Sequence, residues 1–549
     1  MPRLSRMTNL PKHHFRFESR RSPVLSTKGI VATSQPLASM AGLRILSEGG
    51  NAADAAVAAA ATLAVVEPTS TGIGGDCFAL FYRAEDQSVS ALNGSGRSPA
   101  ALDLDVIERC GWERQGPHAV TVPGSIMGWH DTVTRFGRMP LADVLQPAIE
   151  HAEQGFAMTP AIARGWDFQA DLLAQTGPAG QDLLLNGNAP RAGEVWTNQH
   201  IARVMREVAE GGPDAFYRGC PAERIVEAIE HNGGVMALSD LANHCSTFDD
   251  AISTTYRRHR VWECPPNGQG ITTLMALNIL EGFEIGDYEA RSPEVLHIII
   301  EALRLAFADA RALVADPAKS DVPVEEMLSK AYAAKRRQLI CEDQAIELAS
   351  SGFLPGQSDT VYLSAADGDG NACSFINSNY EGFGSCIVPR ECGFSLQNRG
   401  AGFVVDDPEH PNALAGGKRP YHTIMPSMIT RHDGSLFASY GVMGGWNQPQ
   451  GQTQVVLNLI DRGMDAQTAI DAPRVSMYEE PPNGPIYVED TFGIEVLSAL
   501  ALLGHPVVPA SGAMRTGVVG KGQIIYRDPD SGVLWGGSDP RADGCAVPL

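Results

Sequence analysis

A hairpin pattern around residue 360 constrains this chain more than any other feature. Residues 360–363 (TVYL) are mostly β-branched or aromatic, residues 367–371 (DGDGN) have the composition of a tight turn, and residues 372–376 (ACSFI) are largely apolar. The pattern predicts a β-hairpin whose first strand opens at Thr360. Because a Thr that opens a strand before an Asp-Gly turn is ordinary, the local pattern alone assigns no chemistry.

Cleavage of the chain in front of Thr360 would give this residue a catalytic role. An amino-terminal Thr supplies a hydroxyl nucleophile and, in its own α-amine, a base that activates the hydroxyl. The α-amine ionises near neutral pH, so part of it is free base there. An internal Thr lacks this base. The hypothesis requires cleavage between Asp359 and Thr360, with residues 351–359 as a flexible cleavage loop, and predicts a large subunit of residues 1–359 and a small subunit of residues 360–549.

Motifs along nearly the whole chain surround Thr360 in a fixed order. They are residues 34–82, TVPGSIMGW (121–129), AFYRG (215–219), CPPNGQG (264–270), GKRPYHTIMP (417–426), GVMGG (441–445) and GSDPRADG (537–544). Together they resemble the γ-glutamyltransferase family of N-terminal nucleophile hydrolases. The resemblance implies an autoprocessing amidase or acyltransferase, without a cofactor, that cleaves γ-glutamyl (glutathione-type) or related acyl amides through a Thr360 acyl-enzyme. It also implies an α+β fold, a four-layer αββα sandwich in which both subunits form one packed body.

The resemblance assigns catalytic roles to three more residues. Gly444 and Gly445 match the glycine pair whose backbone N–H groups form the family's oxyanion hole, where a Cβ would hinder close approach to the substrate. The alternative is a plain turn before the helix expected over residues 452–462. Ser378 stands where the family keeps a hydroxyl that hydrogen-bonds the nucleophile. The alternative for Ser378 is an ordinary polar loop residue.

Arg97 lies close to the position of the family's carboxylate-binding Arg. The match is imperfect, because alignment on the following Pro99 puts the family's Arg nearer Ser95. A guanidinium in this loop could bind a substrate carboxylate with two hydrogen bonds. The alternative is an Arg on the surface, and both interpretations stay open.

The positions expected to bind a γ-glutamyl head group depart from the family. Tyr380 and Gly402 replace an Asn and an Asp that grip the substrate's α-amino group, and His422-Thr423 replace a Ser-Ser pair that holds its α-carboxylate. Loss of the Asp removes the charged partner that a desolvated ammonium needs. His422 could instead bind an acyl-chain carboxylate or carbonyl, and Arg399 could contribute positive charge nearby. A structural role for His422 is the alternative. The substitution Gly402→Asp is expected to restore a preference for γ-glutamyl amides.

These departures resemble the branch of the family with glutaryl-cephalosporin acylase-like and oxamate amidohydrolase-like members. Such an acylase or amidohydrolase is an alternative function, and an inactive relative that stays uncut and acts as a binding protein is another. The chain has no GxSxG elbow, GxxxxGK[ST] loop or HExxH motif that would indicate an unrelated enzyme. The expected partners are a small-molecule amide and an amino acid or peptide acceptor, and the subunit pair could assemble further.

Charge and hydrophobicity argue against two other classes. The net charge is −22 and the pI is near 5.0, whereas nucleic-acid binding needs a basic surface. The longest strongly apolar stretch, residues 55–66, has only 12 residues and is too short to span a bilayer. We expect a buried helix there, with Asn51 as its cap and Gly49-Gly50 ending the preceding helix.

The amino-terminal residues 1–21 contain Arg and Lys but no apolar core of a secretory signal, which predicts a cytoplasmic protein. A transit peptide is the alternative, although Pro2 and Pro11 would interrupt its amphipathic helix. The 10 Cys residues include no CxxC pair, which favours reduced packing cysteines over a disulfide or zinc framework. No metal site is expected from these patterns.

Overall fold

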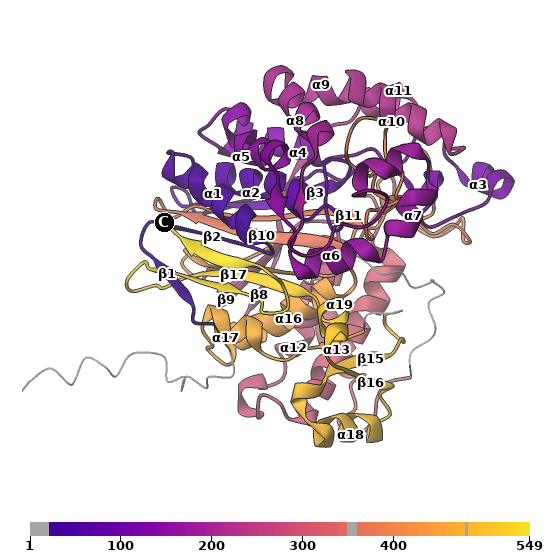
Figure 1. Cartoon of the computed structure of the whole chain (residues 1–549). Helices are drawn as coiled ribbons and strands as arrows, with labels where there is room; N and C mark the ends of the chain where they lie inside the picture. The colour runs from indigo at the N-terminus through magenta and orange to yellow at the C-terminus, as the bar shows by residue number, and fades with distance from the viewer. Residues whose placement is uncertain (1–20, 348–358, 478–480) are drawn as a thin grey trace, which may run out of the picture.

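Two seven-stranded antiparallel sheets form the centre of the computed structural model, which describes residues 21–347, 359–477 and 481–549 (Figure 1). The first sheet has the strand order β1 (Val24–Ser26), β18 (Leu534–Ser538), β17 (Lys521–Arg527), β13 (Leu436–Met443), β12 (Ser427–Arg431), β9 (His259–Glu263) and β8 (Ile252–Tyr256). The second sheet has the order β19 (Cys545–Pro548), β2 (Gly29–Thr33), β10 (Asp359–Asp367), β11 (Ala372–Tyr380), β3 (Asp76–Arg83), β4 (Ser88–Asn93) and β7 (Thr247–Asp250). The predicted hairpin therefore occupies the middle of the second sheet.

Helices cover the outer face of each sheet (Figure 1). Over the second sheet lie α1 (Pro36–Ser47), α2 (Ala52–Val66), α4 (Ser125–Phe136), α5 (Leu141–Gln154) and α8 (Gln199–Gly211). Under the first sheet lie α12 (Gly270–Leu280), α13 (Pro293–Leu313), α16 (Asn447–Ile460) and α17 (Ala466–Asp471). A third apolar cluster fills the space between the sheets. The four-layer αββα architecture expected from the resemblance is confirmed.

Shorter elements complete the two halves. The remaining α-helices are α3 (Leu104–Cys110), α6 (Pro160–Asp167), α7 (Ala170–Gln175), α9 (Pro213–Tyr217), α10 (Cys220–His231), α11 (Leu238–Ala242), α14 (Val324–Met327), α15 (Lys330–Arg337), α18 (Ile494–Leu502) and α19 (Ala513–Val518). Short 3₁₀ helices are η1 (Pro117–Ala119), η2 (Pro178–Leu183), η3 (Ile285–Asp287), η4 (Arg399–Gly402) and η5 (Asp490–Phe492). Two small sheets pair β14 (Val475–Ser476) with β15 (Ile486–Glu489) and β16 (Val507–Ala510), and β5 (Phe156–Ala157) with β6 (Val195–Trp196).

The hairpin of β10 and β11 alternates its side chains between two apolar layers. Val361 and Leu363 face the helices above, whereas Tyr362 packs into the cluster between the sheets. At the turn, Asp367 Oδ1 accepts from the backbone N–H of Asn371 at 3.0 Å, and Oδ2 accepts from the N–H of Ala52 at 3.0 Å. The turn is thereby joined to the first residue of α2, and the hairpin prediction is confirmed.

Helix α2 is the buried helix that the Ala-rich stretch predicts, and all of its residues are buried. The Asn51 side chain accepts from Ala53 N and Asp54 N, while Asp54 Oδ2 accepts from Asn51 N, which completes a capping box. Gly49, just after α1, has φ +103°, a conformation that favours glycine. In the described residues, no helix combines the length and apolarity that a membrane crossing requires.

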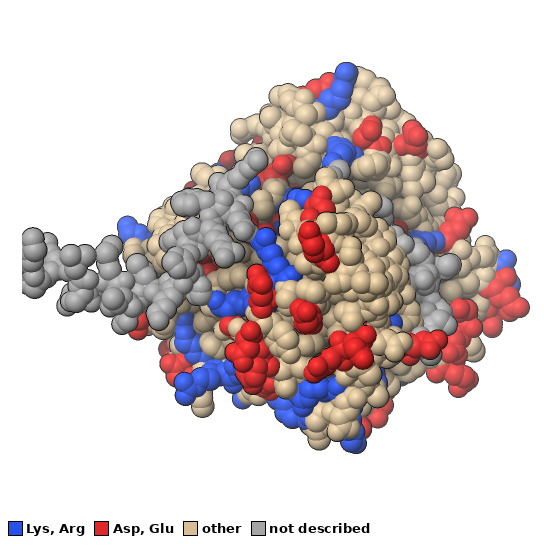
Figure 2. All heavy atoms as spheres, turned by 90° about the horizontal axis from the view of Figure 1, so that it is seen from below, with Lys and Arg blue, Asp and Glu red and all other residues tan. Residues whose placement is uncertain are grey.

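The cysteines and the surface add two observations. All 10 cysteines lie in the described ranges and none is in a disulfide. On the face shown in Figure 2, acidic and basic side chains are interspersed, and the described part of that face has no broad basic patch. The amino-terminal segment that carries the leader prediction and the expected cleavage loop up to residue 358 lie outside the described residues, apart from Arg21.

The Asn51 cap gives a test of this architecture. Asn51→Ala should lower the free energy of unfolding by about 0.5–2 kcal/mol, because two amide groups at the start of α2 lose their acceptor. Urea unfolding followed by circular dichroism measures the change. Asn51→Ser keeps an acceptor and should recover part of the loss, and equal effects of the two variants would contradict a capping role.

Candidate active site

Thr360 lies at an irregularity in the pairing of β10 with β11. Asp359 pairs with Tyr380 but Val361 pairs with Asn377, so β11 has one more residue than β10 between these pairs. Tyr380 has φ +80°, which is costly for a bulky residue and is typical of strained functional sites. The bulge brings the Ser378 hydroxyl to 3.0 Å from Thr360 Oγ1, and Thr360 is only 1% exposed.

Ser378 is held in place by two donors besides its contact with Thr360. Ser378 Oγ accepts from the backbone N–H of Tyr380 at 2.8 Å and from Arg399 Nη2 at 3.1 Å. The Ser378 oxygen is therefore held between the Arg399 guanidinium, a backbone N–H and Thr360. The hydrogen bond between the two hydroxyls positions Thr360 Oγ1 beside this group.

Arg399, on η4, is a buried cation two hydrogen bonds from Thr360. Its Nη1 donates to Thr423 Oγ1 at 2.8 Å, and its guanidinium lies 4.2 Å from the centre of the Tyr380 ring. Burial lowers the pKa of Arg399 to about 10, with Tyr380, Asp76 and Glu381 acting in the opposite direction. The guanidinium Nε is buried and has no hydrogen-bond partner among the described residues, so it is a donor available to a ligand.

Arg114 holds Tyr380 from the other side and was not found by sequence reasoning. Its Nη2 donates to the Tyr380 hydroxyl at 3.0 Å, its Nε donates to Glu381, and its guanidinium lies 5.2 Å from the ring centre. Burial raises the pKa of Glu381, and the charge of Arg114 opposes this shift. Arg114 stands alone in a loop without a recognisable pattern, so no signal in the sequence could have placed it here.

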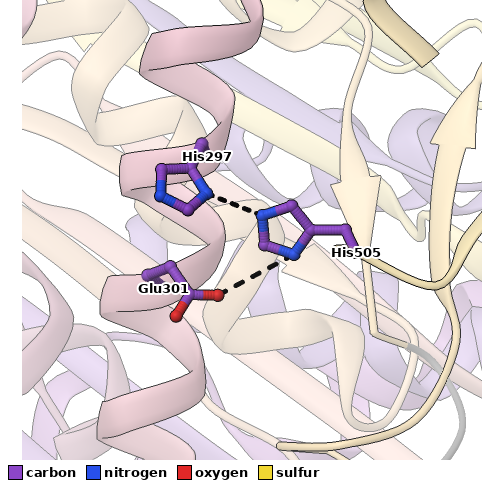
Figure 3. A group of neighbouring side chains, drawn as sticks. All are labelled: His297, Glu301 and His505. Carbon is purple, nitrogen blue, oxygen red and sulfur yellow. Dashed lines mark hydrogen bonds and ion pairs between the residues drawn. The ribbon is translucent and has the colours of Figure 1, made fainter. Parts of the chain in front are cut away.

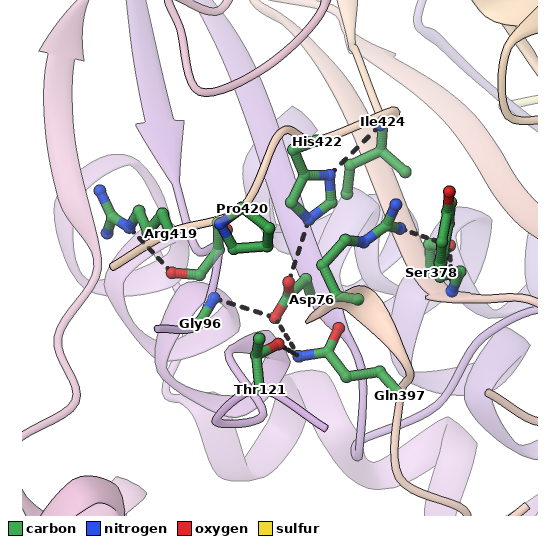
Figure 4. A network of polar contacts seen from close by, with 12 residues as sticks. Asp76, Gly96, Thr121, Ser378, Gln397, Arg419, Pro420, His422 and Ile424 are labelled. Atoms are coloured by element: carbon green, nitrogen blue, oxygen red, sulfur yellow. Dashed lines mark hydrogen bonds and ion pairs between the residues drawn. The ribbon is translucent and has the colours of Figure 1, made fainter. Parts of the chain in front are cut away.

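His422 takes part in a buried network with Asp76 (Figure 4). Its Nδ1 accepts from the N–H of Ile424 at 3.3 Å, so its Nε2 carries the proton and donates to Asp76 Oδ2 at 3.0 Å. Burial lowers the pKa of His422 well below its usual value and raises the pKa of Asp76 to about 6. Both ring nitrogens are occupied, so the geometry favours a structural histidine and gives no support to the predicted substrate contact.

Gln269 joins the glycine pair to the Arg399 group. Its Nε2 donates to the carbonyl oxygens of Thr423 at 2.6 Å and Gly445 at 2.9 Å. Gly444 has φ +126° and Gly445 has φ +55°, both positive values that a side chain disfavours. In the part of the chain that the structure describes, the backbone N–H of neither glycine has an acceptor. Gln269 lies in the CPPNGQG motif, which could have indicated it.

Arg97 is not joined to this group by any hydrogen bond or ion pair between described residues. Its side chain is partly exposed, and its charge acts on Arg419 and His244, whose pKa values are lowered chiefly by burial. The neighbouring Gly96 N–H does reach the site, because it donates to Asp76 Oδ1 at 3.2 Å. The structure thus gathers Thr360, Ser378, Tyr380, Arg399, Thr423 and Gly445 in one network, and leaves Arg97 beside it.

Comparisons with known proteins agree with this arrangement. The sequence model described as Gamma-glutamyltranspeptidase matches residues 38–549. The glutathione hydrolase-like YwrD proenzyme of Bacillus subtilis (strain 168) is 39% identical, over 95% of this chain and 99% of that protein. The oxamate amidohydrolase proenzyme of Klebsiella pneumoniae subsp. pneumoniae is 34% identical, over 95% and 99%. The crystal structure of a cephalosporin acylase from Bacillus halodurans superposes with a TM-score of 0.88 at 42% identity, over 98% of this chain and 99% of the other.

Proposed function

The chain belongs to the gamma-glutamyltranspeptidase family of hydrolases, and we propose that it is a proenzyme that cuts its own Asp359–Thr360 bond. Cleavage would separate residues 1–359 from residues 360–549 within one packed body. The observation that carries the proposal is the contact between Thr360 and Ser378, in which a buried hydroxyl is held by a second hydroxyl near the start of an irregular strand pair. Two similar proteins, the YwrD protein and the oxamate amidohydrolase, are named proenzymes, which supports the proposed self-cleavage.

Maturation follows from the same hydroxyl. Thr360 Oγ attacks the carbonyl carbon of Asp359, the peptide C–N bond breaks, and the acyl group moves to oxygen as an ester. The released α-amine takes up the proton that the hydroxyl gives up. Water then hydrolyses the ester, which leaves a carboxylate on Asp359 and a free amino terminus on Thr360.

In the mature enzyme the α-amine of Thr360 acts as the base. It accepts the proton of the Thr360 hydroxyl while Oγ attacks the amide carbon of the substrate, and it returns the proton to the leaving amine. The hydrogen bond between Ser378 and Thr360 orients Oγ for the attack. We assign the N–H groups of Gly444 and Gly445 to the oxyanion. Water releases the acyl group as an acid, and an amino acid or peptide acceptor would receive it by transfer.

The acyl group favoured by this site ends in a carboxylate and lacks an ammonium. Arg399 offers positive charge and an unpartnered Nε, whereas Tyr380 and Gly402 supply no negative charge where the family binds an ammonium. This supports an anionic acyl amide, such as a glutaryl amide, over a strictly γ-glutamyl one. The expectation that Gly402→Asp restores a preference for γ-glutamyl amides meets a steric obstacle. The Cβ of an Asp at position 402 would lie 2.5 Å from the carbonyl oxygen of Tyr421.

A second candidate is hydrolysis of a short oxamate-type amide. The bonds of 3.0 Å from Thr360 to Ser378 and 3.1 Å from Ser378 to Arg399 put Nη2 within about 6 Å of the nucleophile. A carboxylate attached directly to the scissile carbonyl would reach the guanidinium at this range. The similarity to the oxamate amidohydrolase proenzyme favours the same candidate.

Replacement of the nucleophile tests maturation. Thr360→Ala should remain a single 58.6 kDa chain without amidase activity, because the hydroxyl serves both steps. Thr360→Ser retains a hydroxyl and should yield two subunits, which intact-mass analysis and amino-terminal sequencing would detect. Two-subunit processing of Thr360→Ala would contradict the assignment, and an uncut wild-type protein without activity would support a binding role.

The oxyanion assignment predicts a rate effect larger than the folding effect. Gly445→Ala should lower kcat by about 10²–10³, or roughly 2.7–4 kcal/mol, since one donor is displaced. The protein should still fold, although the positive φ of Gly445 adds a backbone cost of about 1–2 kcal/mol for Ala.

Gly512→Ala is the matched control for this variant. Gly512 has a nearly identical φ of +54° and open space where a Cβ would be placed, so it reports backbone strain alone. Equal kcat values for Gly445→Ala and Gly512→Ala at the same folded fraction would show that the glycine pair is a turn.

A substrate panel tests the acyl pocket. A glutaryl amide should be cleaved within about tenfold in kcat/KM of its γ-glutamyl counterpart, a difference of at most about 1.4 kcal/mol. Arg399→Gln should lower kcat/KM for both by about 10²-fold, because a charge-assisted hydrogen bond is lost.

The control substrate for the panel is a butyryl amide, which has no carboxylate and should be affected far less by Arg399→Gln. An equal loss on the butyryl amide would mean that Arg399 only positions Ser378. A preference of 100-fold or more for the γ-glutamyl amide would refute relaxed head-group recognition, and an oxamate amide as the best substrate would favour the second candidate.

A further inference from the structure

A buried cluster of two histidines and a glutamate lies away from Thr360, in the helical layer under the first sheet (Figure 3). His297 and Glu301 are one turn apart on α13, and His505 follows α18. The three residues are at most 3% exposed, and one ligand atom from each lies within 4.8 Å of the others. His505 is 208 positions from His297, so no sequence motif could have shown the cluster.

The two imidazoles turn one nitrogen toward each other and the other nitrogen toward an oxygen. His297 Nδ1 lies 2.7 Å from His505 Nε2. On the far sides, His297 Nε2 lies 2.6 Å from the carbonyl oxygen of Cys341, and His505 Nδ1 lies 3.8 Å from Glu301 Oε1. An oxygen acceptor behind each imidazole is the arrangement that orients histidine ligands toward a metal ion.

A count of protons shows that the cluster is incomplete without a cation. A carbonyl only accepts, so His297 Nε2 carries a proton and its Nδ1 is a lone pair. His505 Nε2 must then carry the proton between the rings. That leaves the His505 Nδ1 lone pair facing Glu301 Oε1, and His505 Nδ1 indeed has no hydrogen-bond partner among the described residues. Two acceptors facing each other in a buried site are unfavourable.

A second proton on His505 would also satisfy these groups, but it would place another positive charge beside the carboxylate oxygen that Arg304 already compensates. Arg304 donates to Glu301 Oε1 at 2.8 Å, and Glu301 Oε2 accepts from the N–H of Ile346 at 2.9 Å. The carboxylate is therefore fixed in place as an acceptor, with lone pairs left for His505.

We propose that His297 Nδ1 and His505 Nε2 bind a borderline divalent cation such as Zn²⁺ in place of the proton between them. His505 then carries its proton on Nδ1 and donates it to Glu301, which removes the clash of acceptors. Imidazole nitrogen suits Zn²⁺. Zn–N bonds of about 2.0–2.1 Å require the two nitrogens to move apart to about 3.4 Å, and water completes the coordination.

The site has a consequence for the processed enzyme. His297, Glu301 and the carbonyl of Cys341 precede the proposed cleavage bond, whereas His505 follows it. A bound ion would therefore join the two subunits after cleavage. This consequence rests on the proposed maturation, but the metal site itself does not.

Metal binding to the purified full-length protein tests the proposal. After chelator treatment and dialysis, titration with ZnCl₂ should load about one equivalent and raise Tm, because the ion binds the folded state. His297→Gln and His505→Gln should each lower the affinity at least tenfold and abolish the Tm shift. His130→Gln on α4 is the matched control and should behave as wild type. Retention of full affinity in both cluster variants, or no binding by the wild type, would overturn the site.

A second measurement covers the case in which the variants do not fold. X-ray absorption of wild-type protein loaded with one equivalent of Zn²⁺ should show about two imidazole ligands at roughly 2.0–2.1 Å. A first shell without imidazole would overturn the proposal. The Thr360→Ala protein should bind Zn²⁺ as tightly as wild type, so loss of catalysis and loss of the metal site can be told apart.

Discussion

The buried charge of Arg399 is the constraint around which the candidate site is arranged. A guanidinium removed from water is tolerated only when hydrogen bonds and opposite charges compensate the lost hydration. The compensating groups come from three separate parts of the chain, namely Asp76, the neighbouring residues Ser378, Tyr380 and Glu381, and Thr423. Their arrangement holds the Ser378 oxygen, which lies 3.0 Å from Thr360 Oγ1. The cation that we assign to acyl recognition also orients the proposed nucleophile.

The sandwich brings together groups that neither sheet could assemble alone. Thr360 is the second residue of β10 in the second sheet, while the glycine pair follows β13 in the first. The sheets approach closely at Gly441, where a Cβ would lie 2.5 Å from the ring of Tyr362. A larger residue there would separate the layers and with them the two parts of the site. The close packing of this interior is therefore a condition for the proposed chemistry.

Much of the framework could be predicted from local patterns. The alternation around residues 360–376 and the turn residues between them identify the hairpin, and Asn51 identifies the start of α2. Ordered motifs identified the family, and through it Ser378. Contacts between distant residues left no such pattern. Arg114 bonds to Tyr380, 266 positions along the chain, and nothing in its local sequence indicates that contact. The partners of the two His422 ring nitrogens, which favour a structural histidine, likewise become visible only in three dimensions.

By itself, the sequence determined the family, the αββα architecture and the candidate nucleophile, because these depend on the order of residue types along the chain. Only the tertiary structure decided which polar groups meet. It showed that Ser378 Oγ lies between Thr360 and Arg399, that a Cβ at position 402 would meet the carbonyl oxygen of Tyr421, and that His297 and His505 turn one ring nitrogen toward each other. The reason is that hydrogen-bond direction, protonation and free space depend on every neighbour in three dimensions, and those neighbours come from segments hundreds of residues apart.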